Sequence, residues 1–318
     1  VIHEEWRTRR TPSFRMSRKT DKALFKGSKY AKHDVIGKLD VIDNCSYETL
    51  KSFYDDWYRP DLQAVAVVGD VDVDKIEQKI KEKFGQIEKP KNPKERYIED
   101  IPDNKEPLIG IATDKEASRS MMRILYKHDP IKEKDLDYFR ETIKHDLYTQ
   151  MYRDRLQEYT QKENQPFIYG TAYYGGIARS KDAYLSLAIP KNDQVDRALE
   201  ILLIENKRLK EHGFTQTELE RNKKKLLSNL KQKYNNRNKT KSKKYIWKYL
   251  SNFMENEPAP GIKFKYEYVQ KILPSITLEE MNELPTQWIT DENMVVTINA
   301  VKTENNEIPE KKDVLATI

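Results

Sequence analysis

The residues that could carry out chemistry are few and widely spaced in this sequence. The one cysteine, Cys45, excludes both an internal disulfide framework and a zinc cage made of thiolates. No two histidines lie three to five residues apart, so no helix can present a histidine pair to a metal ion. The nucleophile elbow, the glycine-rich phosphate loop and the EF-hand spacing are also absent. We therefore expect no complete catalytic constellation within the chain. The five histidines are His3, His33, His128, His145 and His212.

The composition favours a folded protein that does not enter the membrane. The 318 residues are about twice a typical domain length, which predicts two domains. The longest apolar runs, at 64–68 and 294–298, have about five residues, whereas a membrane-spanning helix needs roughly 20. The net charge of +6 is unevenly spread, because the stretch from Arg221 to Lys248 holds twelve Lys/Arg and no Asp/Glu.

An internal repeat gives the strongest indication of the architecture. Two segments align without gaps at an offset of 231 residues. Ser46 begins the first and Thr277 the second, and each is a favoured helix cap. Apolar residues then recur at helical spacing until a tryptophan, Trp57 or Trp288, closes each segment. We expect two copies of one α+β unit.

A buried, β-rich run follows each copy of the repeat. Ala64–Val68 and Met294–Ile298 are both expected to form strands. Pro285 stands in the second copy where the first has Tyr54, which predicts a shorter or kinked helix. A second unit beginning near residue 106 would place the start of the first about 125 residues before Val1, so we expect the leading domain to lack that part.

The remaining pattern divides the chain into two units joined by a linker. The proline-rich, charged residues 91–105 read as the linker between 1–90 and 106–318. Strand patterns alternate with long amphipathic helices, which predicts an α+β class with a mixed or antiparallel sheet covered by helices. The predicted helices are 73–84, 135–161, 195–209, one starting after Thr215, 245–253 and 264–273, and the predicted strands are 108–113, 121–126, 167–178 and 183–189.

Several short motifs occur in order along the first unit. They are Val-Ile-x-Glu-Glu-Trp-Arg at 1–7, Gly-Ser-x-Tyr at 27–30, Trp-Tyr-Arg-Pro-Asp at 57–61 and Val-Gly-Asp at 68–70. Together they resemble the pitrilysin/insulinase family of zinc metallopeptidases, in its bacterial branch similar to the mitochondrial processing peptidase. The resemblance implies two related helix-covered domains that form half of a clamshell around a peptide substrate, with the first domain here truncated at its N-terminus.

The resemblance also implies a single metal ligand in this chain. In the family, a His-x-x-Glu-His helix supplies two zinc ligands and the general base, and a glutamate further along supplies the third ligand. The Val-Ile-x-x-Glu pattern places that glutamate at Glu5. Glu4 is expected to be exposed or to lie behind the ligand, because a helix turns by about 100° per residue. The His-x-x-Glu-His segment is absent here, so we expect Zn²⁺ in the parent protein and neither stoichiometric zinc nor peptidase activity in this chain.

The second unit is expected to be an inactive sister domain. Its long helix at 135–161 carries only His145, and the repeat offset places Asn236 opposite Glu5. The resemblance implies two partners, a peptide substrate and a second half-clamshell from the same chain or another subunit. If the source is bacterial, it favours a periplasmic or cell-envelope location.

Two other functions remain open from the sequence. The fold also serves as a non-catalytic assembly subunit, which would need no metal. The stretch Arg221–Lys248 interleaves basic and aromatic residues, a pattern found in nucleic-acid-binding modules. We favour a long helix with a solvated basic face, with Leu226, Leu227 and Leu230 turned inward, and hence no nucleic-acid partner.

Overall fold

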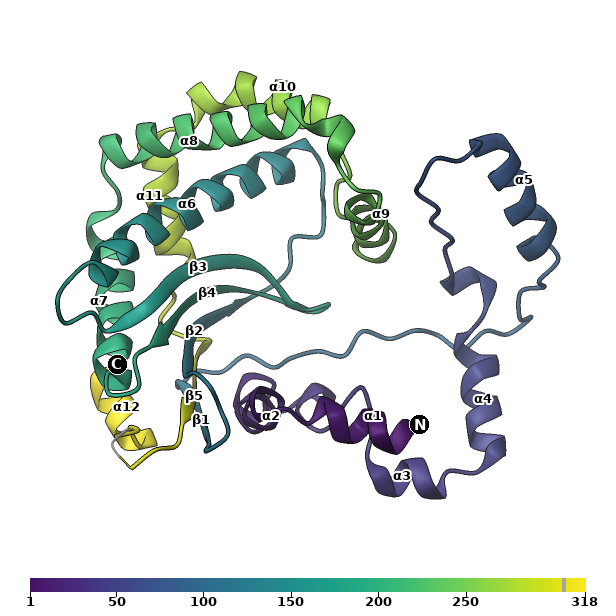
Figure 1. Ribbon diagram of the computed structural model, residues 1–318, viewed down its shortest axis with the longest axis horizontal. Helices are drawn as coiled ribbons and strands as arrows, with labels where there is room; N and C mark the ends of the chain where they lie inside the picture. Colours follow the sequence, from purple (N-terminus) through teal and green to yellow (C-terminus); the bar gives the residue numbers. More distant parts are fainter. Residues whose placement is uncertain (305–306) are drawn as a thin grey trace.

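A five-stranded mixed sheet forms the centre of the computed structural model, which describes residues 1–304 and 307–318. The strands lie side by side in the order β1-β5-β2-β4-β3 (Figure 1). β1 and β5 pair in parallel, and the other neighbours are antiparallel. The predicted α+β class is therefore confirmed. The strands are β1 (Leu108–Asp114), β2 (Met121–His128), β3 (Phe167–Ala178), β4 (Lys181–Pro190) and β5 (Met294–Val301).

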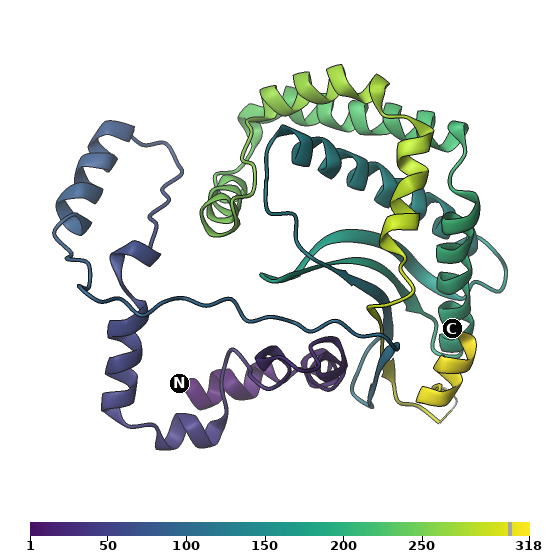
Figure 2. The ribbon, with the colours of Figure 1, turned by 180° about the vertical axis from the view of Figure 1, so that it is seen from behind.

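Helices that follow the sheet strands in sequence cover one of its faces. α6 packs on β3 and α7 on β4, while α8 and α10 form an outer layer over α6 (Figures 1 and 2). Large buried aromatic residues such as Tyr148 and Tyr152 fill the space between α6 and the sheet. The helices are α6 (Leu136–Thr160), α7 (Val195–His212), α8 (Gln216–Asn235), α9 (Lys243–Glu255), α10 (Ile262–Ile272), α11 (Leu278–Trp288) and α12 (Lys311–Thr317).

A helix from the start of the chain covers the opposite face of the sheet. Successive side chains of a strand point to opposite faces. On β5, Val296 belongs to the large core beneath α6, whereas Val295 packs in a separate cluster with Leu24 of α2. The sheet is thus enclosed between the long helices and α2. The five N-terminal helices are α1 (Ile2–Arg9), α2 (Pro12–Leu24), α3 (Leu39–Asn44), α4 (Tyr47–Trp57) and α5 (Val73–Phe84).

The segment 33–98 forms an arm that extends away from the sheet (Figures 1 and 2). Within this fully described segment, Arg59 is the one buried residue. The strand expected at Ala64–Val68 is absent, and that prediction is wrong. A strand needs a neighbour to accept and donate its backbone hydrogen bonds, and no strand of the described residues lies beside this run. Val65 and Val67 are 47% and 48% exposed as a result.

The helix signals in both copies of the repeat are confirmed. The Ser46 hydroxyl accepts a hydrogen bond from the Thr49 amide at the start of α4. Thr277 forms a full capping box with Glu280 at the start of α11. Of the two effects expected of Pro285, a shorter or a kinked helix, the shorter helix is wrong, because α4 and α11 each have 11 residues. The kink stays a prediction. The capping box and the buried apolar face of α11 outweigh the one amide that proline lacks.

The predicted linker has no regular structure but is anchored at its end. The described stretch 87–107 contains neither helix nor strand. The Ser180 hydroxyl donates a hydrogen bond to the Glu99 carbonyl at 2.7 Å, and Lys127 donates to the Pro102 carbonyl. Ile101 is completely buried. The last residues of the linker therefore pack as part of the sheet domain.

Candidate functional site

The candidate metal ligand, Glu5, lies on the short helix α1. Acidic residues fill the first turn of α1 and arginines the last, the arrangement that the helix dipole favours. The Glu5 side chain is 47% exposed, and its Oε1 accepts a hydrogen bond from Arg9 Nε at 2.9 Å. The carboxylate is thus open to solvent and is held by a flexible side chain from its own helix.

The neighbouring carboxylate of Glu4 has a different partner. Arg7 donates from Nε to both carboxylate oxygens of Glu4 at 3.0 Å. This hydrogen bonding lowers the pKa of Glu4. The Glu4 side chain is 62% exposed. The two adjacent carboxylates are therefore held by separate arginines.

Glu5 can supply one ligand of a zinc site, but it cannot form the site alone. A hydrolytic zinc ion needs three protein ligands and an open position for water. The part of the chain that the structure describes contains no group of three His, Cys, Asp or Glu side chains arranged to hold a metal. The histidine on the same helix, His3, contacts Asp43 of α3 at 2.5 Å instead. The described residues therefore supply Glu5 as a candidate ligand but not the other two ligands that a zinc ion at Glu5 would need.

The histidine on the long helix of the sheet domain is packed among aromatic rings. The ring of His145 lies 4.7 Å from that of Tyr174 and 4.9 Å from that of Trp288. Burial lowers the pKa of His145 to about 4, so the imidazole is neutral at physiological pH. Asn236, which the repeat sets opposite Glu5, ends α8 as an exposed amide. Neither residue has the partners that hydrolysis requires.

A cavity of about 910 Å³ opens beside His145 in the sheet domain. Phenol groups and carboxylates line it, and Lys134 and the Tyr138 hydroxyl both bind Glu257 at its rim. Such a wall can hold polar groups of a peptide but offers no nucleophile or general base paired for catalysis. The sequence reasoning missed this cavity, since its residues come from distant segments. They include Tyr138, His145, Asp146, Tyr173, Asp182 and Glu257.

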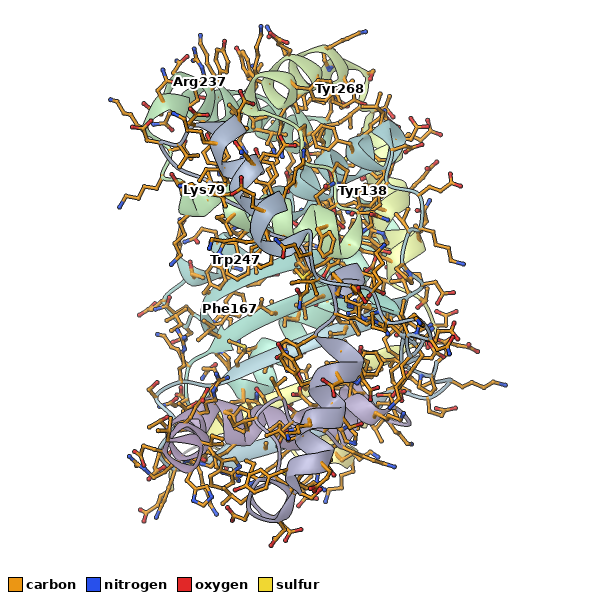
Figure 3. The ribbon with its side chains drawn as sticks, turned by 90° about the vertical axis from the view of Figure 1, so that its right-hand side faces the viewer. Lys79, Tyr138, Phe167, Arg237, Trp247 and Tyr268 are labelled. Carbon is orange, nitrogen blue, oxygen red and sulfur yellow. The ribbon has the colours of Figure 1, made fainter. Side chains whose placement is uncertain are left out.

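The basic stretch is divided between two helices and the turn that joins them. In α8, Leu230 is buried and Leu226 and Leu227 pack against the core, as expected. On α9, Trp247 is 63% exposed. In the view of Figure 3, Arg237 is labelled among the upper helices, whereas Trp247 lies lower, toward the sheet. The basic and aromatic residues are therefore spread over α8, α9 and the turn between them.

Within residues 1–304 and 307–318, no helix combines the length and apolar character required to cross a membrane.

Comparisons with known proteins place the fold. Residues 44–226 match the family described as the peptidase M16 inactive domain. The chain is 24% identical over 290 residues to the probable zinc protease PqqL of Haemophilus influenzae, covering 90% of this chain and 31% of that protein. This chain therefore spans about a third of the length of that relative. The match confirms the resemblance predicted from the short motifs.

Solved structures agree with this fold. The first half of the periplasmic protease PqqL from Escherichia coli matches with a TM-score of 0.87 at 22% identity, covering all of this chain and 68% of that one. A predicted insulinase family protease from Yersinia pestis matches with a TM-score of 0.73 at 17% identity, covering 93% of this chain and 63% of that one. At these identities the likeness concerns the fold.

Proposed function

This chain belongs to the peptidase M16 inactive-domain family, and from that premise we propose that it is part of a zinc-dependent endopeptidase that cleaves peptides or unfolded segments. We use "parent protein" for the longer polypeptide that this proposal requires. The chain itself supplies one zinc ligand and a non-catalytic domain, and the two halves of the clamshell enclose the substrate. The zinc protease names of its relatives support the proposal.

We assign residues 1–90 to the C-terminal part of the catalytic-type domain, 91–105 to the linker and 106–318 to the inactive sister domain. The sheet and its large core lie within 106–318, which supports a complete domain there. The arm shows the opposite pattern. Leu50 and Phe53 on α4 are 60% and 56% exposed, although they form the apolar face of a capped helix. An exposed apolar face of this kind marks a surface that packs against other residues, which supports the assignment of the arm to a larger domain.

The observation that carries the proposal is the exposed carboxylate of Glu5 in the Val-Ile-x-Glu-Glu string. When bound, zinc would lower the pKa of a water molecule and polarise the peptide carbonyl. Glu5 would contribute a negatively charged oxygen ligand, and Arg9 would release it by rotating about its flexible side chain. Glu4, held by Arg7, would stay outside the ligand set.

The sister domain is proposed to bind rather than cut the substrate. Its cavity presents carboxylates and phenols beside the neutral His145, and these groups can accept and donate hydrogen bonds to a peptide. The similarity to a protease described as periplasmic supports a periplasmic or cell-envelope location if the source is bacterial.

The experiment measures zinc in the parent protein and in this chain. We expect about one zinc per parent molecule, none in the isolated chain, and near-complete loss of zinc in the parent with Glu5→Ala. Glu4→Gln is the matched control, one residue away on the same exposed helix, and should retain the metal. Unchanged zinc in Glu5→Ala would remove Glu5 from the site. A parent protein without zinc or peptidase activity would instead support the non-catalytic assembly subunit.

A further inference from the structure

The helix that carries Glu5 has little packing of its own. None of the eight residues of α1, all of them described, is buried. α1 is joined to α2 through Arg10 and Thr11, and the Thr11 hydroxyl caps α2 by accepting from the Phe14 amide at 3.3 Å. At the start of α1, His3 contacts Asp43 of α3, which belongs to the arm. The orientation of Glu5 relative to the sheet domain therefore depends on what holds the other end of α1.

The next helix, α2, is fixed to the sister domain. Its buried residues Met16, Thr20 and Leu24 recur at intervals of four and face the sheet. The Thr20 hydroxyl lies 3.3 Å from Asn299 Oδ1 on β5. α2 is thus a stable base against which α1 can be held.

One arginine on α2 connects the end of α1 to the sister domain. Arg15 donates from Nε and Nη2 to the two carboxylate oxygens of Asp114, at 2.7 and 3.0 Å. Its Nη1 donates to the carbonyl oxygen of Arg10 at 2.9 Å. Arg10 is the C-cap residue of α1, and its guanidinium stacks over the Trp6 ring on that helix at 4.2 Å. All three guanidinium nitrogens of Arg15 are used.

The acceptor on the sister domain is itself held in place. Asp114 ends β1, and its side chain is 12% exposed. Its Oδ1 also accepts from the Glu116 amide at 2.9 Å, and the Glu116 carboxylate contacts Arg15 Nη2 at 2.5 Å. The hydrogen bonds from Arg15 lower the pKa of Asp114, so the pair is fully charged at neutral pH.

We propose that Arg15 is a positioning residue, which sets the orientation of the Glu5 helix by joining the end of α1 to Asp114 of the sister domain. This inference rests on the proposed role of Glu5 as a zinc ligand. It gives the inactive domain a part in metal binding, because one end of the connection lies on its first strand. Lysine cannot replace Arg15, since an ammonium group cannot form the planar fork and reach the Arg10 carbonyl together.

The first test measures, by amide hydrogen exchange in this chain, how well the backbone amides of α1 are protected. Arg15→Met keeps most of the apolar stem and removes the fork. We expect exchange in residues 5–10, whose amides can be bonded within the helix, to become about tenfold faster, as for the loss of a charge-assisted hydrogen bond. Asp114→Asn should act in the same direction, and Arg15→Lys should fail to restore protection. The matched control is Arg18→Met, on the same helix, because Arg18 pairs with Asp34 rather than with α1 or the sheet.

The second test measures zinc affinity in the parent protein by competition with a chelator. We expect Arg15→Met and Asp114→Asn to weaken zinc binding by about 10- to 100-fold, the usual effect of losing a group that orients a ligand. Arg18→Met should leave the affinity within about twofold of the unmodified protein. Circular dichroism confirms folding of each variant, and Arg15→Lys provides a milder substitution if Arg15→Met unfolds.

The outcomes separate this inference from the proposed function. If Glu5→Ala loses zinc while Arg15→Met and Asp114→Asn keep normal affinity and normal exchange in α1, the positioning role is wrong and Glu5 remains a ligand. If Glu5→Ala keeps zinc, the proposed ligand is wrong. If Arg15→Met and Arg18→Met change amide exchange in α1 and zinc affinity equally, Arg15 only stabilises α2 in general. That result also overturns the positioning role.

Discussion

The main chain of Thr20 on α2 lies directly over Gly110 on β1. A Cβ atom placed on Gly110 would be 2.9 Å from the Thr20 carbonyl oxygen and 3.0 Å from the Thr20 Cα. The atoms in the way are backbone, which cannot rotate aside as a flexible side chain can. Glycine at this position therefore allows α2 to approach the sheet closely enough for Met16 and Leu24 to be buried.

Replacing Gly110 with alanine should separate α2 from the sheet. Overpacking of a well-packed contact costs about 1 to 3 kcal/mol, and we expect the free energy of unfolding to fall by that amount in Gly110→Ala. Urea denaturation monitored by tryptophan fluorescence measures the change. The amides of α2 should also exchange faster, because the helix would lose part of its contact with β1.

Gly176→Ala provides the control within the same sheet. The nearest atom that a Cβ at Gly176 would meet, Asp182 Oδ1, is 3.6 Å away, which is an ordinary contact. We expect a change within about 0.5 kcal/mol. If both substitutions cost the same free energy, the close approach of Thr20 to Gly110 has no special role.

Local hydrogen-bond chemistry explains why much of the fold was predictable. The cap at Ser46 and the capping boxes at Thr215 and Thr277 involve residues within one helical turn, so their sequence pattern is sufficient to locate the helix starts. The apolar run at 294–298 became a central strand because β1 and β2 flank it. The similar run at 64–68 did not, since strand formation depends on distant partners that the run itself cannot reveal.

The candidate site shows the same limit. Glu5 was identified through a short motif, which lies in one stretch of sequence. The pair of Arg15 and Asp114 joins residues 99 positions apart, and neither residue belongs to a pattern that indicates the other. The cavity beside His145 likewise depends on the packing of α6 against the β3–β4 hairpin.

We predict that the basic stretch does not bind nucleic acid. In α8, Lys225 lies 3.3 Å from Asp154 and Lys223 lies 3.1 Å from Glu220, so acidic neighbours compensate part of the charge. Fluorescence anisotropy with a labelled single-stranded oligonucleotide should show no measurable affinity at ~50 mM salt. Binding that weakens steeply as salt is raised, and that is lost on replacing Trp247 with alanine, would contradict this prediction.

The acid sensitivity of the fold should depend on His145. In the unfolded chain a histidine has a pKa near 6.5, whereas burial lowers the pKa of His145 to about 4 in the folded protein. Between these values the unfolded state binds more protons, so the free energy of unfolding should fall as the pH drops from about 6.5 to 4. His145→Phe keeps a ring against Tyr174 and Trp288 but removes this proton. Urea denaturation at pH 7 and pH 4.5 should show that the free energy of unfolding of His145→Phe falls by about 2 kcal/mol less than that of the unmodified chain.

His212→Gln, at a side chain that is 75% exposed, is the control, and its free energy of unfolding should fall as much as that of the unmodified chain. Equal losses in His145→Phe and the unmodified chain would show that folding does not lower the pKa of His145.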